Sequence, residues 1–235
     1  MKNTLLLLLL SGFLHGQQAI KLHPVKSFNV PVQEPSDIAY NSKSNTFFVV
    51  SDKGALYELS ANFSLINKLY SNLSDPEAVF VSGDTVWVAE ERSRLVRRII
   101  KGNETRSIAY SVPYDGGRNK GYESLCRLPN GNMLLLTERD PIWAIELDAD
   151  FREKHRIELN LKGDVSAAAV WNNSLFLLSD EGSCIYKISY PDYTIQNKYT
   201  LPIINPEGMC FGPDGTLWIL SDAEHKVYQF EAKSW

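Results

Sequence analysis

Short apolar runs separated by turn residues recur along most of the chain. Each run holds four to six aliphatic, aromatic or β-branched residues and ends in a turn such as "VSGD", "LPNGN" or "GPDG". Runs of this length and composition predict β-strands joined by tight turns. Five stretches share the same order of runs and turns, and they cover residues 35–59, 76–99, 122–147, 165–188 and 206–230.

The five stretches repeat at a regular interval. An acidic residue closes the second apolar run of each stretch, and these residues are Asp52, Glu90, Glu138, Asp180 and Asp222. They lie 38, 48, 42 and 42 positions apart. This period is typical of a four-stranded propeller blade and is too long for a leucine-rich repeat. The first two runs of each unit are almost continuously apolar, as expected of inner strands that are buried on both faces.

A fourth, more polar strand follows the third run in the first four units, as in "LINKLYSN" and "TIQNKYTLP". The fifth unit lacks one before Trp235. The segment "KLHPVKSFNVP" (21–31) has the same alternating pattern and precedes the first unit. We therefore predict an all-β protein: one five-bladed β-propeller of four-stranded blades over residues 17–235, closed by the N-terminal strand completing the last blade.

The first 16 residues differ from the repeats. A basic start, "MKN", precedes the apolar run "TLLLLLLSGFL" and then "HGQQ". This order is that of a secretory signal peptide, and the apolar run is too short to span a bilayer comfortably. We expect cleavage after Gly16 and an exported protein in the periplasm or cell envelope. The alternative is an uncleaved N-terminus that tethers the protein to the inner membrane.

Charge and cysteine content narrow the classes of partner. The formal net charge is −4, which disfavours nucleic-acid binding because that function needs a basic face. The odd count of three cysteines, Cys126, Cys184 and Cys210, argues against a disulfide framework, and we interpret them as small buried residues. Zinc is disfavoured because no Cys/His pair has ligand spacing.

The repeated acids are expected to meet at one mouth of the propeller channel. The first strand of each blade lines the axis, and its start shares a face of the disc with the end of the second strand. This rule places Glu77 and Glu90, Glu123 and Glu138, and Glu207 and Asp222 together in the second, third and fifth units. In the first and fourth units it pairs Ser36 with Asp52 and Ser166 with Asp180.

Eight carboxylates near one mouth repel one another unless a cation neutralises them, and calcium takes six to eight oxygen ligands. Glu77, Glu123 and Glu207 are the primary candidate ligands because they start axial strands, and Glu138 and Asp180 complete the candidate set. The alternative is structural. An acid that ends a strand can accept hydrogen bonds from the next turn, a role suited to Asp52, Asp180 and Asp222, which all occur as Ser-Asp.

Two polar features adjoin the same mouth. The loop "VPYDGGRNKGYE" (112–123) connects the second blade to the third and is expected on the acidic face, either as a lid or partner-contact loop or as a long solvated connection. Arg92 and Arg139 directly follow second-strand acids and are expected to pair with them.

Several sequence blocks resemble the SdiA-regulated proteins, the YjiK or CarP-like family of bacterial envelope β-propellers. They are "DPEAV", "VAEER", "NKGYESL", "LLLTERDP", "LLSDE" and "PEGMCFGPDGTLWILSD", in family order across the mature chain. The resemblance implies a five-bladed propeller with bound calcium, an exported or inner-membrane location, and a relation to NHL-repeat propellers, which mediate protein contacts. The resemblance also implies that Glu77, Glu123 and Glu207 are calcium ligands. The fourth unit departs from the family, with "DVSAAAV" where related blocks have Ser-Gly.

Two functions follow from these observations. The first is a monomeric, non-enzymatic calcium-binding propeller that contacts a protein partner or takes part in calcium homeostasis, since the chain has no Gly-x-Ser-x-Gly elbow and no evident Ser-His-Asp set. The alternative is a calcium-dependent hydrolase of the lactonase or phosphatase type. In that case Glu138 or Asp180 is the candidate base, with an anion held by Arg92, Lys120 or Arg139.

Overall fold

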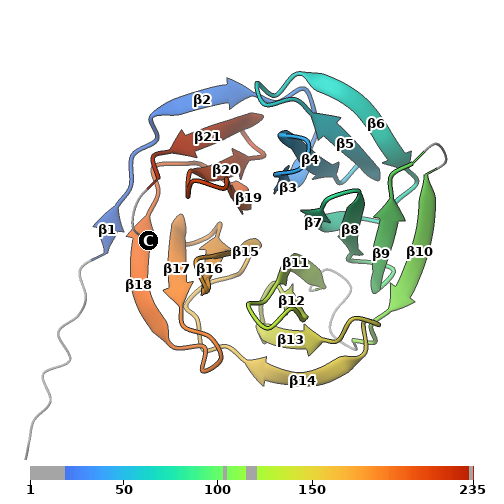
Figure 1. The fold of residues 1–235 in the computed structure, drawn as a ribbon. Coiled ribbons are helices and arrows are strands. Elements are labelled where there is room, and N and C mark those ends of the chain that lie inside the picture. Colours follow the sequence, from blue (N-terminus) through green and yellow to red (C-terminus); the bar gives the residue numbers. More distant parts are fainter. Residues whose placement is uncertain (1–18, 103–104, 115–120, 233–234) are drawn as a thin grey trace, which may run out of the picture.

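The repeats form five sheets arranged in a ring around a central axis (Figure 1). The computed structural model describes residues 19–102, 105–114, 121–232 and 235. The expected signal peptide (1–16), the centre of the 112–123 loop and Lys120 lie outside the described residues. Within those residues, no helix has the length and apolar character needed to cross a membrane.

Each sheet is one blade, numbered here by its place in the chain. Blade 1 contains β3 (Pro35–Asn41), β4 (Thr46–Ser51), β5 (Ala55–Leu59) and β6 (Leu65–Ser71). Blade 2 contains β7 (Pro76–Ser82), β8 (Thr85–Glu90), β9 (Leu95–Ile100) and β10 (Arg106–Ser111). Blade 3 contains β11 (Tyr122–Arg127), β12 (Met133–Thr137), β13 (Trp143–Leu147) and β14 (Glu153–Glu158).

The last two blades include the N-terminal strands. Blade 4 contains β15 (Ala167–Trp171), β16 (Ser174–Ser179), β17 (Cys184–Ile188) and β18 (Ile195–Thr200), with β1 (Ile20–Lys21) added parallel to β18. Blade 5 contains β19 (Pro206–Phe211), β20 (Leu217–Ser221), β21 (Lys226–Phe230) and then β2 (Lys26–Asn29). The five-bladed fold and its closure by the N-terminal strand are thus confirmed.

The closing segment differs in one respect from the single strand expected over 21–31. It is divided into β1 and β2, which pair with two different blades. Pro24 lies between them, and proline has no N–H to donate to a sheet ladder. The segment therefore ties blade 4 as well as blade 1 to blade 5.

The apolar core is divided into five clusters that lie between neighbouring blades. At the closure, Phe47 of blade 1 stacks on Phe63 with ring centroids 4.5 Å apart. Trp218 of blade 5 packs edge-on against Phe47, and Phe28 of β2 lies 5.1 Å from Phe63. The three cysteines are buried and free, as expected.

Candidate functional site

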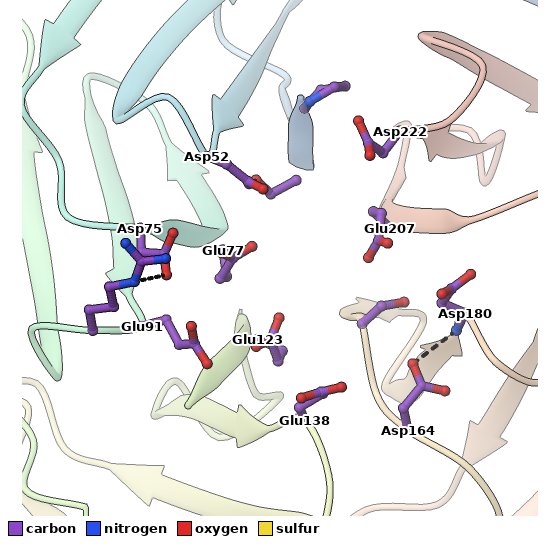
Figure 2. Close-up of a pocket in the computed structure, with 14 residues that line it drawn as sticks. Asp52, Asp75, Glu77, Glu91, Glu123, Glu138, Asp164, Asp180, Glu207 and Asp222 are labelled. Carbon is purple, nitrogen blue, oxygen red and sulfur yellow. Dashed lines mark hydrogen bonds and ion pairs between the residues drawn. The ribbon is translucent and has the colours of Figure 1, made fainter. Parts of the chain in front are cut away.

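The acidic residues meet at one mouth of the central channel, where the first strands of the blades begin (Figure 2). A cavity of about 350 Å³ opens there, and ten of the residues that line it are acidic. The set falls into three groups by position in the blade. No cysteine or histidine of the described chain lines this cavity, so its protein donors are oxygen atoms.

The inner group consists of Glu77, Glu123 and Glu207, which surround the axis in Figure 2. In each case the pairing between the first and second strands shifts register at the glutamate, for example between Pro76 and Ala78. Such a bulge leaves one residue unpaired and redirects its side chain. The bulges explain how three glutamates in buried strands present their carboxylates to the channel.

The outer group consists of the residues that directly follow the second strands: Asp52, Glu91, Glu138, Asp180 and Asp222. The N–H groups of the following turns donate instead to the hydroxyl oxygens of the serines that precede these acids. The Oγ of Ser51 accepts from the Lys53 N–H at 3.2 Å, and the Oγ of Ser179 accepts from the Gly182 N–H at 3.0 Å. In the described chain, no turn N–H donates to the Asp180 or Asp222 carboxylate, which leaves both facing the cavity.

The expectation that Glu90 reaches this mouth is wrong by one position. Glu90 is the last residue of β8 and is buried away from the cavity, where its carboxylate pairs with Arg97 and accepts from the Ser93 hydroxyl at 2.9 Å. Glu91 takes the place expected for it. Glu90 occupies the position held by Ser51 in blade 1 and Ser179 in blade 4, and its carboxylate also accepts from the Ser74 N–H at 3.2 Å.

The third group, Asp75 and Asp164, was not predicted. Each lies two residues before the start of the axial face, at Glu77 or Ser166. The Asp164 carboxylate accepts from the Ser179 hydroxyl at 2.6 Å and the Asp180 N–H at 3.2 Å. The repeated spacing in "DPE" and "DVS" is the sequence signal that identifies this position.

Among the described residues, one set of acids is close enough to hold a metal ion. Asp75, Glu77 and Glu91 place one carboxylate oxygen each within 4.8 Å of the others. All three belong to blade 2, whereas Glu123, Glu207, Glu138 and Asp180 line the same cavity from other blades. Glu77 is the residue shared by this cluster and the ligand set predicted from the sequence.

In the part of the chain that the structure describes, Arg92 and Arg139 form ion pairs with acids of the mouth. Arg92 pairs with Asp75 at 2.7 Å, and Arg139 lies 3.1 Å from Glu138 and also pairs with Glu181. Arg139 therefore pairs with the second-strand acid beside it, whereas Arg92 pairs with Asp75 rather than with its neighbour Glu91. These two guanidinium groups offset only part of the charge of the ten described carboxylates.

Burial and mutual repulsion raise the pKa values of the inner carboxyl groups. The pKa of Glu77 rises from 4.5 to about 9, first through burial and then through the charges of Asp52, Asp75 and other acids. The pKa of Glu207 rises to about 8 through burial and then the charges of Asp180 and its neighbours. Burial and the neighbouring glutamates likewise raise the pKa of Glu123.

Asp37 is a further buried acid. It lies in β3 directly after Ser36, which lines the acidic mouth. Its Oδ1 accepts from the Ile38 N–H and its Oδ2 from the Val79 N–H, both at 2.8 Å. Burial raises its pKa well above the ordinary value. Asp37 joins blade 1 to blade 2 inside the channel.

Replacing Asp37 with asparagine is expected to lower stability by about 1–3 kcal/mol, because one acceptor becomes an N–H₂ group that faces a backbone N–H. For a chain of this size, the melting temperature falls by about 2–4 °C per kcal/mol. Thermal unfolding followed by circular dichroism measures the change. Asp150→Asn is the control, since its side chain is 72% exposed. An unchanged melting temperature in Asp37→Asn contradicts the bridging role.

The comparison with protein families identifies the family to which this propeller belongs. The family model described as SdiA-regulated matches residues 17–231. The chain belongs to the SdiA-regulated family. This result confirms the resemblance seen in the sequence blocks. None of the curated proteins compared with the chain matches it.

Solved structures of other propellers resemble this SdiA-regulated protein. The glutaminyl cyclase of Myxococcus xanthus is 11% identical, with a TM-score of 0.71 over 91% of this chain and 98% of its own. A gluconolactonase of Xanthomonas campestris is 12% identical, with a TM-score of 0.61 over 88% and 78%. A virginiamycin B lyase of Staphylococcus aureus is 17% identical, with a TM-score of 0.53 over 88% and 73%. At these identities the similarity shows the fold alone.

Proposed function

We propose that this protein is an exported calcium-binding propeller without catalytic activity, and that its metal site is the acidic mouth of the channel. The observation that carries the proposal is the cluster of Asp75, Glu77 and Glu91, whose oxygens lie within 4.8 Å of one another. Calcium prefers oxygen ligands and accepts six to eight of them in flexible geometry. The wider cavity supplies further carboxylates, including Glu123, Glu207, Glu138 and Asp180.

The electrostatics of the mouth favour a divalent cation. Glu77, Glu123 and Glu207 have raised pKa values because they are partly removed from water and repel their neighbours. A bound divalent ion reverses this effect, since it favours the deprotonated carboxylates that coordinate it. The residues present therefore fit calcium in both donor type and charge.

Titration calorimetry on the mature protein tests this function. We expect one calcium site, with an affinity weaker than about micromolar in keeping with an extracytoplasmic protein. Glu77→Gln is expected to weaken binding at least roughly tenfold, because a charged ligand becomes a neutral amide. Glu158→Gln, on the exposed outer strand β14, is the control and should bind as the parent does. A parent protein that binds no calcium at millimolar concentration refutes the proposal.

A role in contacting a protein partner rests on the resemblance to propellers that mediate protein contacts.

An enzymatic role is the second candidate function. Carboxyl groups with pKa values near 8 and 9, at Glu207 and Glu77, have the proton affinity of general acids and bases. Calcium-dependent turnover of a lactone, ester or phosphomonoester by the purified protein would favour the enzyme.

A further inference from the structure

A second cavity opens at the opposite end of the channel. The first strands present the acidic mouth at their starts, and residues nearer their ends line this cavity, among them Tyr40, Phe80, Arg127, Trp171 and Phe211. Its volume is about 310 Å³. This is close to the lower end of the range for small-molecule pockets.

The cavity is separate from the acidic mouth. Ser36 lines the mouth and Ile38 lines the second cavity, while Asp37 between them lines neither. Both oxygens of the buried Asp37 carboxylate accept backbone N–H groups. First strands of five to seven residues rise about 3.3 Å per residue and so separate the two openings by roughly 15–20 Å.

The walls of the second cavity are apolar, in contrast to those of the acidic mouth. Val79, Val81, Leu125, Ala169 and Met209 all contribute to the lining and are all buried. An apolar wall around a cavity favours a ligand with an apolar body, because binding removes the surfaces of both from water.

Aromatic rings at the rim are held in place by their neighbours. Trp171 stacks on Phe211 with centroids 5.8 Å apart and an interplanar angle of 23°. The Phe211 ring also contacts Phe176 at 5.0 Å and Trp235 at 5.8 Å. Since Trp171 and Phe211 are only partly buried, they form a fixed platform on which a flat or aliphatic ligand can pack.

Among the described residues that line the cavity, Arg127 is the cationic side chain, and it lies at the rim, where it can receive an anion. The Arg127 guanidinium lies over the Phe80 and Trp87 rings, 5.7 and 5.6 Å from their centroids, and its side chain is exposed at the cavity. Within the described residues it forms no ion pair. A guanidinium stacked in this way retains N–H donors that suit a carboxylate.

We infer that this second cavity binds a small organic monocarboxylate with an aromatic or short aliphatic body. The body packs between the apolar walls and the Trp171–Phe211 platform, and the carboxylate accepts hydrogen bonds from Arg127. A single guanidinium matches one negative charge, which favours a monocarboxylate over a phosphate dianion. The inference does not depend on calcium binding at the other mouth.

Binding of indole-3-acetate, followed by ¹H–¹⁵N NMR and calorimetry, tests the inference, with indole-3-acetamide as the uncharged counterpart. We expect the carboxylate to bind roughly tenfold or more tightly than the amide, because a hydrogen bond to a charged group is stronger than one to a neutral group. The perturbed resonances should include the Trp171 indole N–H, and calcium should not change the affinity.

Arg127→Gln is expected to remove the preference for the carboxylate while leaving the affinity for the amide unchanged. Since Arg127 is exposed and loses only its stacking on Phe80 and Trp87, the variant should fold with a melting temperature at most a few degrees below the parent's, about 1–4 °C. Arg152→Gln, at a side chain that is 79% exposed elsewhere on the surface, is the control. The inference is overturned if the two probes bind equally, if the preference persists in Arg127→Gln, or if neither probe binds at about 10 mM.

Discussion

A chain that begins at Pro31, and so lacks β1 and β2, is expected to lose its cooperative thermal unfolding transition. Blade 5 would lose its outer strand, leaving the edge of β21 exposed. Two buried core side chains, Leu22 and Val30, would also be removed. Burial of each contributes roughly 1.5–3 kcal/mol, against a total stability of about 5–15 kcal/mol for a typical domain. Circular dichroism melting and gel filtration measure the outcome.

A chain that begins at Leu22 is the matched control for this deletion. It lacks only β1, whose two residues pair with β18, and it keeps the ladder between β2 and β21. A loss of about 1–2 kcal/mol and a retained cooperative transition are expected. If the chain that begins at Pro31 melts like the parent, the ring does not depend on its N-terminal closure.

The blade architecture could be predicted from sequence because a propeller repeats one pattern of apolar runs and turns. Pro24 is visible in the sequence, but the alternation on either side of it predicts one strand. The segment divides into two strands because Pro24 has no N–H to donate and because the edge of β18 in the neighbouring blade can pair with β1. That edge becomes apparent only when the ring is assembled.

The acidic mouth was predictable in outline but not residue by residue. In blades 1, 4 and 5 a serine precedes the outer acid, whereas blade 2 has the doublet Glu90-Glu91, in which the pattern alone does not distinguish the buried residue from the one at the mouth. Asp75 and Asp164 lie in the loops before the axial strands, and their approach to the cavity depends on backbone conformation. At Asp75 this is a positive φ of 56°.

Without calcium, the protein is expected to become less stable as the pH rises from about 4.5 to about 9. Glu77 and Glu207 have pKa values near 9 and 8 in the folded protein, against an ordinary value of 4.5. Between these limits the folded state holds more protons than the unfolded chain, so the free energy of unfolding falls with increasing pH. The decrease is at most about 1.4 kcal/mol per pH unit for each proton difference. Chemical denaturation at pH 5, 7 and 9 in a chelator measures it.

Calcium should oppose this pH-dependent loss, because a bound ion stabilises the ionised carboxylates that the empty mouth disfavours. Binding at pH 7 must then release protons, and the calorimetric enthalpy should vary with the ionisation enthalpy of the buffer. Glu77→Gln should flatten the pH dependence of the calcium-free protein, since the amide does not titrate, whereas Glu158→Gln should leave it unchanged. If the stability of the calcium-free protein instead rises between pH 5 and pH 9, the inner carboxyl groups are already compensated by protein charges and the mouth has no need of a metal ion.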